Sequence, residues 1–274
     1  MFTLNCKGRL LTIGEPIVMG IINATPDSFF SGSRRESVIE ALDTAGKMLA
    51  AGATILDIGG QSTRPGAEPL GVEEETKRVL PVIEAIKEKF PDACISIDTY
   101  FAGVAEAAVA AGASIVNDIS GGAYDPGMLD TVAGLHTPYV CMHLKGVMGD
   151  MHKKPVYKNI TREILDYFIE RIAVCKEKGI HDIIVDPGFG FSKTIDHNFE
   201  LLKGLSVFSI LQKPLLIGVS RKSTIYKTLK TSAEESLNGT TVLNTVALLK
   251  GANILRVHDV REAMEAIRLT NRLL

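Results

Sequence analysis

From about residue 17 to its end, the chain repeats a short apolar run, a polar break and a longer amphipathic stretch. The apolar runs are nearly continuous rather than alternating, which is typical of parallel strands buried on both faces. The longer stretches carry apolar residues every three or four positions, which is the spacing of one helical face. We predict strands over residues 17–22, 54–58, 94–97, 114–116, 139–142, 183–185, 215–219 and 254–257.

A helical pattern follows each predicted strand. The helices are expected over residues 36–51, 72–90, 101–111, 126–133, 161–178, 195–211, 233–250 and from about 260 to the end. Pro81 lies well inside the second helix, so we expect a kink or a short first segment there.

Eight strand–helix alternations in 274 residues predict an α/β fold, a single (β/α)8 TIM barrel with parallel strands and its site at the C-terminal mouth. A doubly wound open sheet is the alternative fold. That fold favours a glycine-rich phosphate loop after the first strand, whereas the loop here begins Asn23-Ala-Thr-Pro. No linker or change of composition divides the chain, so residues 1–274 are predicted to form one domain.

The composition excludes some classes of partner. Lys plus Arg is 30 and Asp plus Glu is 32, without a basic run, so no nucleic-acid partner is expected. No run of 18 apolar residues occurs, which predicts a soluble, cytoplasmic protein without a membrane contact. The four cysteines are scattered, as is typical of free thiols in a reducing compartment.

Every predicted strand ends in polar or ionisable residues. In a barrel these ends converge on one mouth, although an Asp or Asn after a strand can also cap the next helix. The mixture of acids, amides and cations is harder to explain by capping alone. The residues are Asn23, Asp57 with Thr63 and Arg64, Asp98, Asn117, His143, Asp186, Lys222, and Arg256 with His258.

These side chains suit two kinds of ligand. Asp98, Asp186 and the Asn117 amide can bind a flat heterocycle that carries several hydrogen-bond donors and acceptors. Lys222, Arg256 and His258 suit an anionic group, which such barrels commonly bind after strands seven and eight. Asn23 is a candidate oxygen ligand for Mg²⁺, an ion that takes few protein ligands.

Six motifs resemble the dihydropteroate synthase family. They occur in the order of that family from about residue 16 to 262, and so cover nearly the whole chain. They are Met19-Gly-Ile-Ile-Asn-Ala-Thr-Pro-Asp-Ser-Phe, Asp57-Ile-Gly-Gly-Gln-Ser-Thr-Arg-Pro-Gly-Ala, Ser96-Ile-Asp-Thr, Asp186-Pro-Gly-Phe-Gly-Phe, Ser220-Arg-Lys-Ser and Leu255-Arg-Val-His-Asp-Val.

The resemblance implies a transferase of folate biosynthesis. Such an enzyme condenses 6-hydroxymethyl-7,8-dihydropterin pyrophosphate with p-aminobenzoate, and releases dihydropteroate and pyrophosphate. It also implies a Mg²⁺ cofactor and a homodimer. By the same match, the pterin site is Asp98, Asn117, Met142, Asp186, Phe191 and Lys222; the p-aminobenzoate site is Thr63, Arg64, Pro65 and Ser223; the pyrophosphate site is Thr63, Arg256 and His258; and the metal ligand is Asn23.

We expect a dissociative displacement at this site. Pyrophosphate leaves once its charge is neutralised, and the remaining pterin methylene cation is stabilised by Asp98 and Asp186. These two acids and Lys222 are therefore the candidate catalytic residues. Asp57 is expected to orient other residues from beneath the pocket, and residues 62–66 to close over the second substrate.

Two positions depart from the usual family pattern. Ser31 replaces an acidic residue of the first loop, and Gln61 stands where a Glu is common. A catalytically silent pterin-binding protein is therefore one alternative. The other is a pterin-binding methyltransferase domain that works with a corrinoid protein, which has no use for a p-aminobenzoate pocket.

Overall fold

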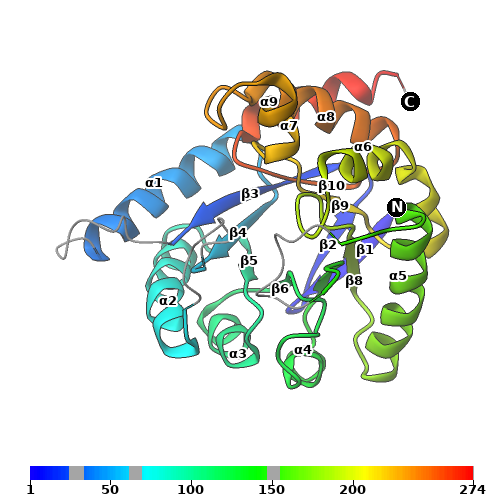
Figure 1. Ribbon diagram of the computed structural model, residues 1–274. Helices are drawn as coiled ribbons and strands as arrows, with labels where there is room; N and C mark the ends of the chain where they lie inside the picture. Colours follow the sequence, from blue (N-terminus) through cyan, green and yellow to red (C-terminus); the bar gives the residue numbers. More distant parts are fainter. Residues whose placement is uncertain (25–33, 62–69, 147–154, 274) are drawn as a thin grey trace.

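The computed structural model describes residues 1–24, 34–61, 70–146 and 155–273. Its strands form a central ring and its helices surround them (Figure 1). The described strands are β1 Phe2–Cys6, β2 Arg9–Ile13, β3 Ile17–Asn23, β4 Ile55–Gly59, β5 Cys94–Asp98, β6 Ile115–Asp118, β7 Tyr139–Met142, β8 Ile183–Asp186, β9 Leu216–Ile217 and β10 Ile254–Val257. The helices are α1 Arg34–Ala51, α2 Val72–Lys89, α3 Ala102–Ala111, α4 Met128–Leu135, α5 Ile160–Glu177, α6 Ile195–Lys203, the 3-10 helix η2 Leu205–Leu211, α7 Ser223–Leu229, α8 Leu237–Leu249 and α9 Val260–Thr270.

The eight parallel strands close on themselves. Hydrogen-bonded neighbours follow the order β8-β7-β6-β5-β4-β3-β10-β9. A parallel bridge between Val185 and Leu215 joins the two ends of this sheet, and the Val185 amide donates to the Pro214 carbonyl at 3.0 Å. The predicted (β/α)8 barrel is thereby confirmed, and the doubly wound open sheet is excluded.

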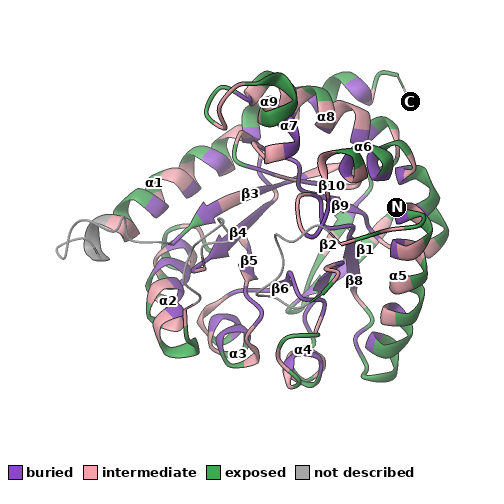
Figure 2. Ribbon diagram, in the orientation of Figure 1, coloured by how far each residue is buried: buried purple, intermediate pink, exposed green. Residues whose placement is uncertain are grey.

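Alternation along the strands separates two apolar layers. Side chains that point outward pack with the helices in the main core, for example Leu56 and Val185. Side chains that point inward form a second cluster inside the barrel, for example Ile55 and Ile184. Burial follows the same division, because the strands are buried while the outer helix faces are exposed (Figure 2).

An N-terminal hairpin closes the end of the barrel opposite the mouth. Strands β1 and β2 pair antiparallel, and Leu4, Cys6 and Ile13 pack on the inward cluster. The Asn5 amide donates to the Asp182 carboxylate, which lies just before β8, at 2.7 Å. The sequence pattern showed only short apolar pieces in this region and did not predict the hairpin.

Three further elements differ from the prediction. Helix α2 is continuous through Pro81, so the expected short first segment is absent; Pro81 is exposed, where water can bind the carbonyl that it leaves free. The predicted helix over 195–211 divides into α6 and η2 at Gly204. Helix α7 begins at Ser223, between the predicted strand 215–219 and the predicted helix 233–250, where the sequence pattern predicts no helix. No helix in the described ranges is both long and apolar enough to cross a membrane.

Candidate active site

The inward side of the strands carries the site. Residues on one face of a strand recur every second position, so each inward apolar residue is followed two positions later by another inward residue nearer the mouth. By this rule, Asp57 faces inward because Ile55 does, and Asp186 faces inward because Ile184 does. The same step leads from the inward cluster to Asn117, Met142 and Arg256.

Arg256 is bonded to two of the acids. Its Nε donates to Asp57 at 2.6 Å, and its Nη2 donates to Asp98 at 2.6 Å. The Asn117 amide nitrogen donates to the same Asp57 oxygen at 3.0 Å. Asp57 is fully buried, so its carboxylate orients Arg256 and Asn117 from beneath the mouth.

Burial changes the protonation equilibria of this ring. It raises the pKa of Asp98 to about 7, although the positive charge of Arg256 opposes the shift. Burial also raises the pKa of Asp186, which Lys222 opposes. The pKa of Lys222 is lowered to about 8, again by burial first. Perturbed groups of both signs at one mouth are typical of a functional site.

The loop after β8 lies along one side of the mouth. The Asp186 carboxylate accepts from the Gly188 amide at 2.8 Å, within its own loop. Lys222 donates to the Phe189 carbonyl at 2.5 Å, and its Nζ lies 4.5 Å from the centre of the Phe191 ring. Phe191 also packs on an apolar cluster that contains Met142. The structure therefore brings together the six residues predicted for the pterin side.

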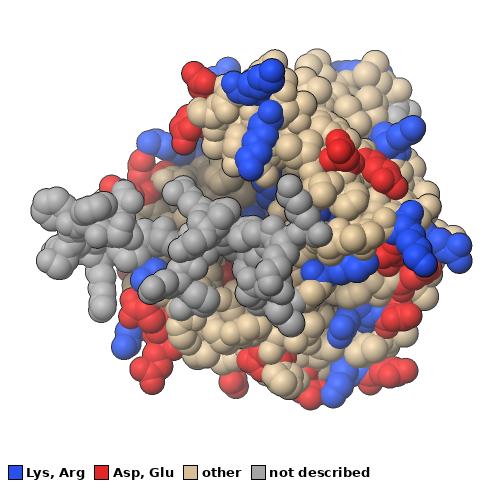
Figure 3. Space-filling model, viewed as in Figure 1, with Lys and Arg blue, Asp and Glu red and all other residues tan. Residues whose placement is uncertain are grey.

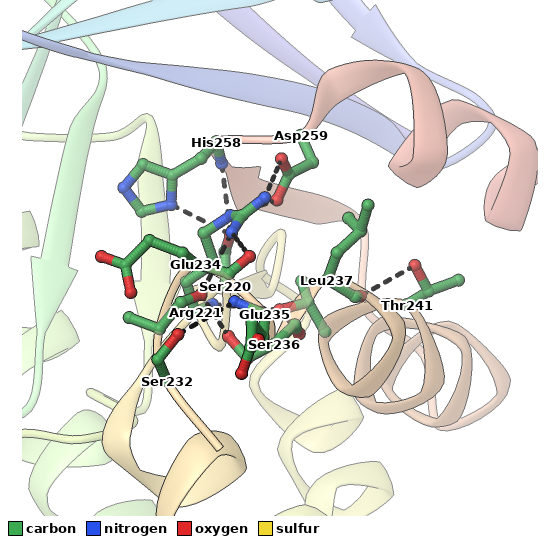
Figure 4. A network of polar contacts seen from close by, with 12 residues as sticks. Ser220, Arg221, Ser232, Glu234, Glu235, Ser236, Leu237, Thr241, His258 and Asp259 are labelled. Carbon is green, nitrogen blue, oxygen red and sulfur yellow. Dashed lines mark hydrogen bonds and ion pairs between the residues drawn. The ribbon is translucent and has the colours of Figure 1, made fainter.

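Hydrogen bonds and an ion pair join the loop after β9 to the loop after β10 (Figure 4). Ser220 Oγ lies 3.0 Å from His258 Nδ1, and the Arg221 guanidinium donates to both Asp259 oxygens at 2.8 Å. Desolvation by the surrounding protein and the charge of Arg256 lower the pKa of His258 to about 4, although the residue itself is exposed to solvent. At pH 7 the imidazole is therefore neutral, so it can take part in hydrogen bonds but carries no positive charge.

The remaining predicted residues lie around the mouth or outside the described ranges. Asn23 is exposed at the end of β3, and Ser223 begins α7 directly after Lys222. Thr63, Arg64, Pro65 and Ser31 fall in segments that the structure does not describe. The visible face is hollowed near its centre, with basic side chains beside the hollow (Figure 3).

One candidate metal ligand, Asn23, lies at this mouth. No cluster of three or more His, Cys, Asp or Glu that could bind a metal occurs among residues 1–24, 34–61, 70–146 and 155–273. An exposed amide oxygen such as that of Asn23 is compatible with Mg²⁺, because this ion commonly keeps water and substrate phosphate ligands.

Known proteins resemble this chain over almost all of its length. The family described as pterin binding enzyme matches residues 19–258. Dihydropteroate synthase from Escherichia coli strain K12 is 44% identical over 268 residues, which is 97% of this chain and 94% of that protein. The chain belongs to the dihydropteroate synthase family. A Streptococcus pyogenes dihydropteroate synthase is 40% identical over 271 residues, which is 97% of this chain and 99% of that protein.

Solved structures of the same family share the fold. Xanthomonas albilineans dihydropteroate synthase with 4-aminobenzoic acid superimposes with a TM-score of 0.91 and 40% identity, over 99% of this chain and 97% of that one. The enzyme of the same organism in complex with 7,8-dihydropteroate gives a TM-score of 0.88 and 37% identity, over 99% of this chain and 98% of that one.

Gln61 and Leu70 flank segment 62–69, and the Gln61 side-chain amide bonds to Leu70. Its Nε2 donates to the Glu75 carboxylate at 2.6 Å and to the Leu70 carbonyl at 3.1 Å. Its Oε1 accepts from the Leu70 amide at 3.1 Å. A glutamate would lack the donor for the first two bonds. Glu75 itself is buried, and burial raises its pKa.

Sequence reasoning missed two residues at the edge of this family's pocket. Glu75 gave no signal, because it occurs in a run of three glutamates at the start of α2. Lys193 is the second residue after the Asp186-Pro-Gly-Phe-Gly-Phe motif, and a lysine in a loop is normally solvated. The structure instead buries Lys193 beside His143, one of the predicted strand-end residues.

Proposed function

We propose that the protein is a dihydropteroate synthase that condenses 6-hydroxymethyl-7,8-dihydropterin pyrophosphate with p-aminobenzoate. The observation that carries this proposal is the inward ring of Asp98, Asn117 and Asp186 at one barrel mouth, with Lys222 beside it. The complexes of the Xanthomonas albilineans enzyme with 4-aminobenzoic acid and with 7,8-dihydropteroate support the same substrates here.

The pterin ring is proposed to bind against Asp98, Asn117 and Asp186. A carboxylate accepts two parallel hydrogen bonds from a guanidine-like edge, and an amide matches a neighbouring donor–acceptor pair. Met142 and Phe191 would pack on the ring faces, since both belong to the apolar cluster at the mouth. Lys222 would contact the pterin from the Phe191 side, where its Nζ already lies over that ring.

The pyrophosphate is proposed to lie toward Arg256, His258 and Thr63. Arg256 supplies a permanent positive charge, and neutral His258 supplies a hydrogen bond. Mg²⁺, with Asn23 as its protein ligand, would neutralise further charge on the leaving group. Lys222 would place a second cation between the leaving group and the ring.

The displacement is proposed to be dissociative. As pyrophosphate leaves, positive charge spreads from the methylene carbon into the pterin ring. Asp98 and Asp186 are fixed beside the ring before the reaction, and one well-placed group of this kind contributes about 3–4 kcal/mol to transition-state stabilisation. The arylamine then attacks the cation and loses a proton to solvent. Asp98, Asp186 and Lys222 are thus the proposed catalytic residues.

The arylamine is proposed to enter from the side of Ser223. Ser223 follows Lys222 directly, and Thr63, Arg64 and Pro65 belong to segment 62–69, which follows Gln61. The two proposed substrate sites would then be adjacent, because Lys222 belongs to one and Ser223 to the other. Adjacent sites are required for the arylamine to reach the methylene carbon in one step.

We also propose that the protein is a cytoplasmic homodimer. All four cysteines are free, which is typical of a reducing compartment. A groove of about 420 Å³ between α8 and α9 carries Leu269 and Leu273, which are 71% and 73% exposed. A second copy would cover these leucines, so Leu269→Glu should convert a dimer to a monomer in sedimentation velocity, whereas an unchanged sedimentation coefficient contradicts this interface.

One assay tests the proposed activity. Purified protein is supplied with pterin pyrophosphate and Mg²⁺, and pyrophosphate release is measured with and without p-aminobenzoate. Release that depends on p-aminobenzoate is expected of a synthase. Pterin binding without turnover would instead indicate a catalytically silent pterin-binding protein.

A further inference from the structure

A second lysine, Lys193, is buried behind the loop after β8. Its side chain is 9% exposed, and its Nζ donates to the Gly188 carbonyl at 2.8 Å and to the Phe191 carbonyl at 3.0 Å. The third neighbour is His143 Nδ1 at 3.3 Å. Three acceptors thus surround an amine that has three protons to donate.

The two carbonyls belong to the loop that presents the pterin residues. Asp186 starts this loop and Phe191 lies near its end, and Lys193 spans both parts from behind. Lys222 reaches the same loop from the pocket side, through the Phe189 carbonyl. The loop is therefore fixed between two lysines, of which only Lys222 faces the substrates.

The Gly188 carbonyl also accepts from the Phe191 amide, at 3.2 Å, and Lys193 donates to it over the shorter distance of 2.8 Å. Gly188 has a φ of +73°, and a Cβ at that position would lie 2.2 Å from the His143 carbonyl oxygen. The backbones of the two loops are therefore in direct contact, which leaves little room for water. Without Lys193 the carbonyls of Gly188 and Phe191 would lose a buried donor, which favours rearrangement of the loop.

The contacts of Lys193 are compatible with either charge state. Burial lowers the pKa of Lys193 to about 7, and it also lowers that of His143, which stays neutral. A charged amine donates to both carbonyls and to the imidazole lone pair. A neutral amine still donates to both carbonyls, and its own lone pair accepts from the other imidazole tautomer.

We propose that Lys193 is a positioning residue, which fixes the loop 186–192 in the shape that presents Asp186 and Phe191 to the pterin ring. This role rests on the proposed function of the pocket. Lys193 does not contact the substrates, so its loss acts on the pterin site through the loop and spares the p-aminobenzoate site.

Lys193→Met tests this role because methionine keeps the length and packing of the side chain but removes every donor. We expect the KM for pterin pyrophosphate to rise and kcat/KM to fall by up to about 100-fold, because a misplacement of about 1 Å can cost that much in catalysis. The KM for p-aminobenzoate should change less than about twofold. Lys213→Met is the matched control, since Lys213 donates to the His181 carbonyl at the opposite end of β8.

Binding of 6-hydroxymethylpterin, measured by calorimetry beside the thermal unfolding midpoint, provides a second readout. A lower midpoint with unchanged pterin affinity and unchanged KM values would show a purely structural role and overturn the proposal. If Lys193→Met does not fold, Lys193→Gln retains an N–H donor on a shorter side chain, and a smaller loss of pterin affinity is expected, again without a change in the KM for p-aminobenzoate. A wild-type protein that binds pterin but forms no dihydropteroate would contradict the proposed activity, whereas the binding comparison would still decide the role of Lys193.

Discussion

The Arg256 guanidinium donates to the Asp98 carboxylate across an Nη2–Oδ2 distance of 2.6 Å, and so joins β10 to β5 across the barrel mouth. Asp98 is proposed to bind the pterin ring and Arg256 the pyrophosphate. In the free protein, Asp98 and Arg256 are bonded to each other. A substrate that carries a pterin ring and a pyrophosphate can therefore replace this ion pair, with the ring bound to Asp98 and the pyrophosphate bound to Arg256.

Removal of Arg256 should destabilise the barrel. Arg256→Gln leaves Asp57, which is 0% exposed, without its cationic partner. Breaking a buried pair in this way costs about 3–5 kcal/mol of unfolding free energy. Urea unfolding measures the loss. Arg78→Gln breaks an i,i+4 pair nearer the surface and should cost less than about 1 kcal/mol, and equal losses in the two variants would contradict the structural role of Arg256.

Asp98 should make activity depend on pH near neutrality. Its pKa of about 7 means that the carboxylate becomes ionised as the pH rises from 6 to 8. We expect kcat/KM for pterin pyrophosphate to rise over this range. In Asp98→Asn it should be about 100-fold lower and should lack this rise. A wild-type profile with the same shape as the Asn variant would contradict the role of the ionised carboxylate.

The same variant tests the linkage to stability. Folding raises the pKa of Asp98 from 3.8 to about 7, so the folded protein binds the extra proton between these values. The stability from this group is fully present below about pH 4 and is lost as the pH rises through about 7. The difference in unfolding free energy between wild type and Asp98→Asn should therefore change between pH 5 and pH 8, and a constant difference would contradict the raised pKa.

Lys222 and Arg64 should separate the two substrate sites. Lys222 contacts the loop after β8 and directly precedes Ser223, so Lys222→Ala is expected to raise the KM of both substrates. Arg64→Ala should mainly raise that of p-aminobenzoate. Steady-state kinetics with each substrate varied in turn measures this. Equal losses for both substrates in Arg64→Ala would mean that the pockets are wrongly assigned.

Replacing the side-chain amide of Gln61 with a carboxylate should disturb its contact with Glu75. Gln61→Glu places two carboxylates at the 2.6 Å contact with Glu75, so one of them must bind a proton. We expect the KM for p-aminobenzoate to rise, more at pH 8 than at pH 6, because deprotonation breaks the contact. The swap Gln61→Glu with Glu75→Gln restores one amide and one carboxylate and should remove most of this pH dependence. A pH-independent KM in the single variant would exclude the proposed pairing.

Local patterns were sufficient to predict the barrel and the ring of strand-end residues. Near-continuous apolar strands separated by amphipathic helices indicate one topology, and period-two alternation places Asp57, Asn117 and Asp186 on the inner face. These are properties of neighbouring residues, which a sequence displays directly.

Partners far apart in the chain could not be predicted in the same way. Arg256 and Asp98 are separated by 158 positions, and either could have faced a ligand instead. The burial of Lys193 depends on how closely two loops approach at Gly188, which depends on backbone geometry rather than on residue type. The N-terminal hairpin was missed because its strands are half exposed and weakly apolar.

Simultaneous analysis of both products decides whether the protein is a dihydropteroate synthase. Wild type and Asp186→Asn are each incubated with pterin pyrophosphate, p-aminobenzoate and Mg²⁺, and both dihydropteroate and pyrophosphate are quantified. We expect wild type to form the two products in equal amounts and only when p-aminobenzoate is present, and Asp186→Asn to form them about 100-fold more slowly. Pyrophosphate release without dihydropteroate, or equal rates in the two proteins, would contradict the proposed activity and the role of Asp186.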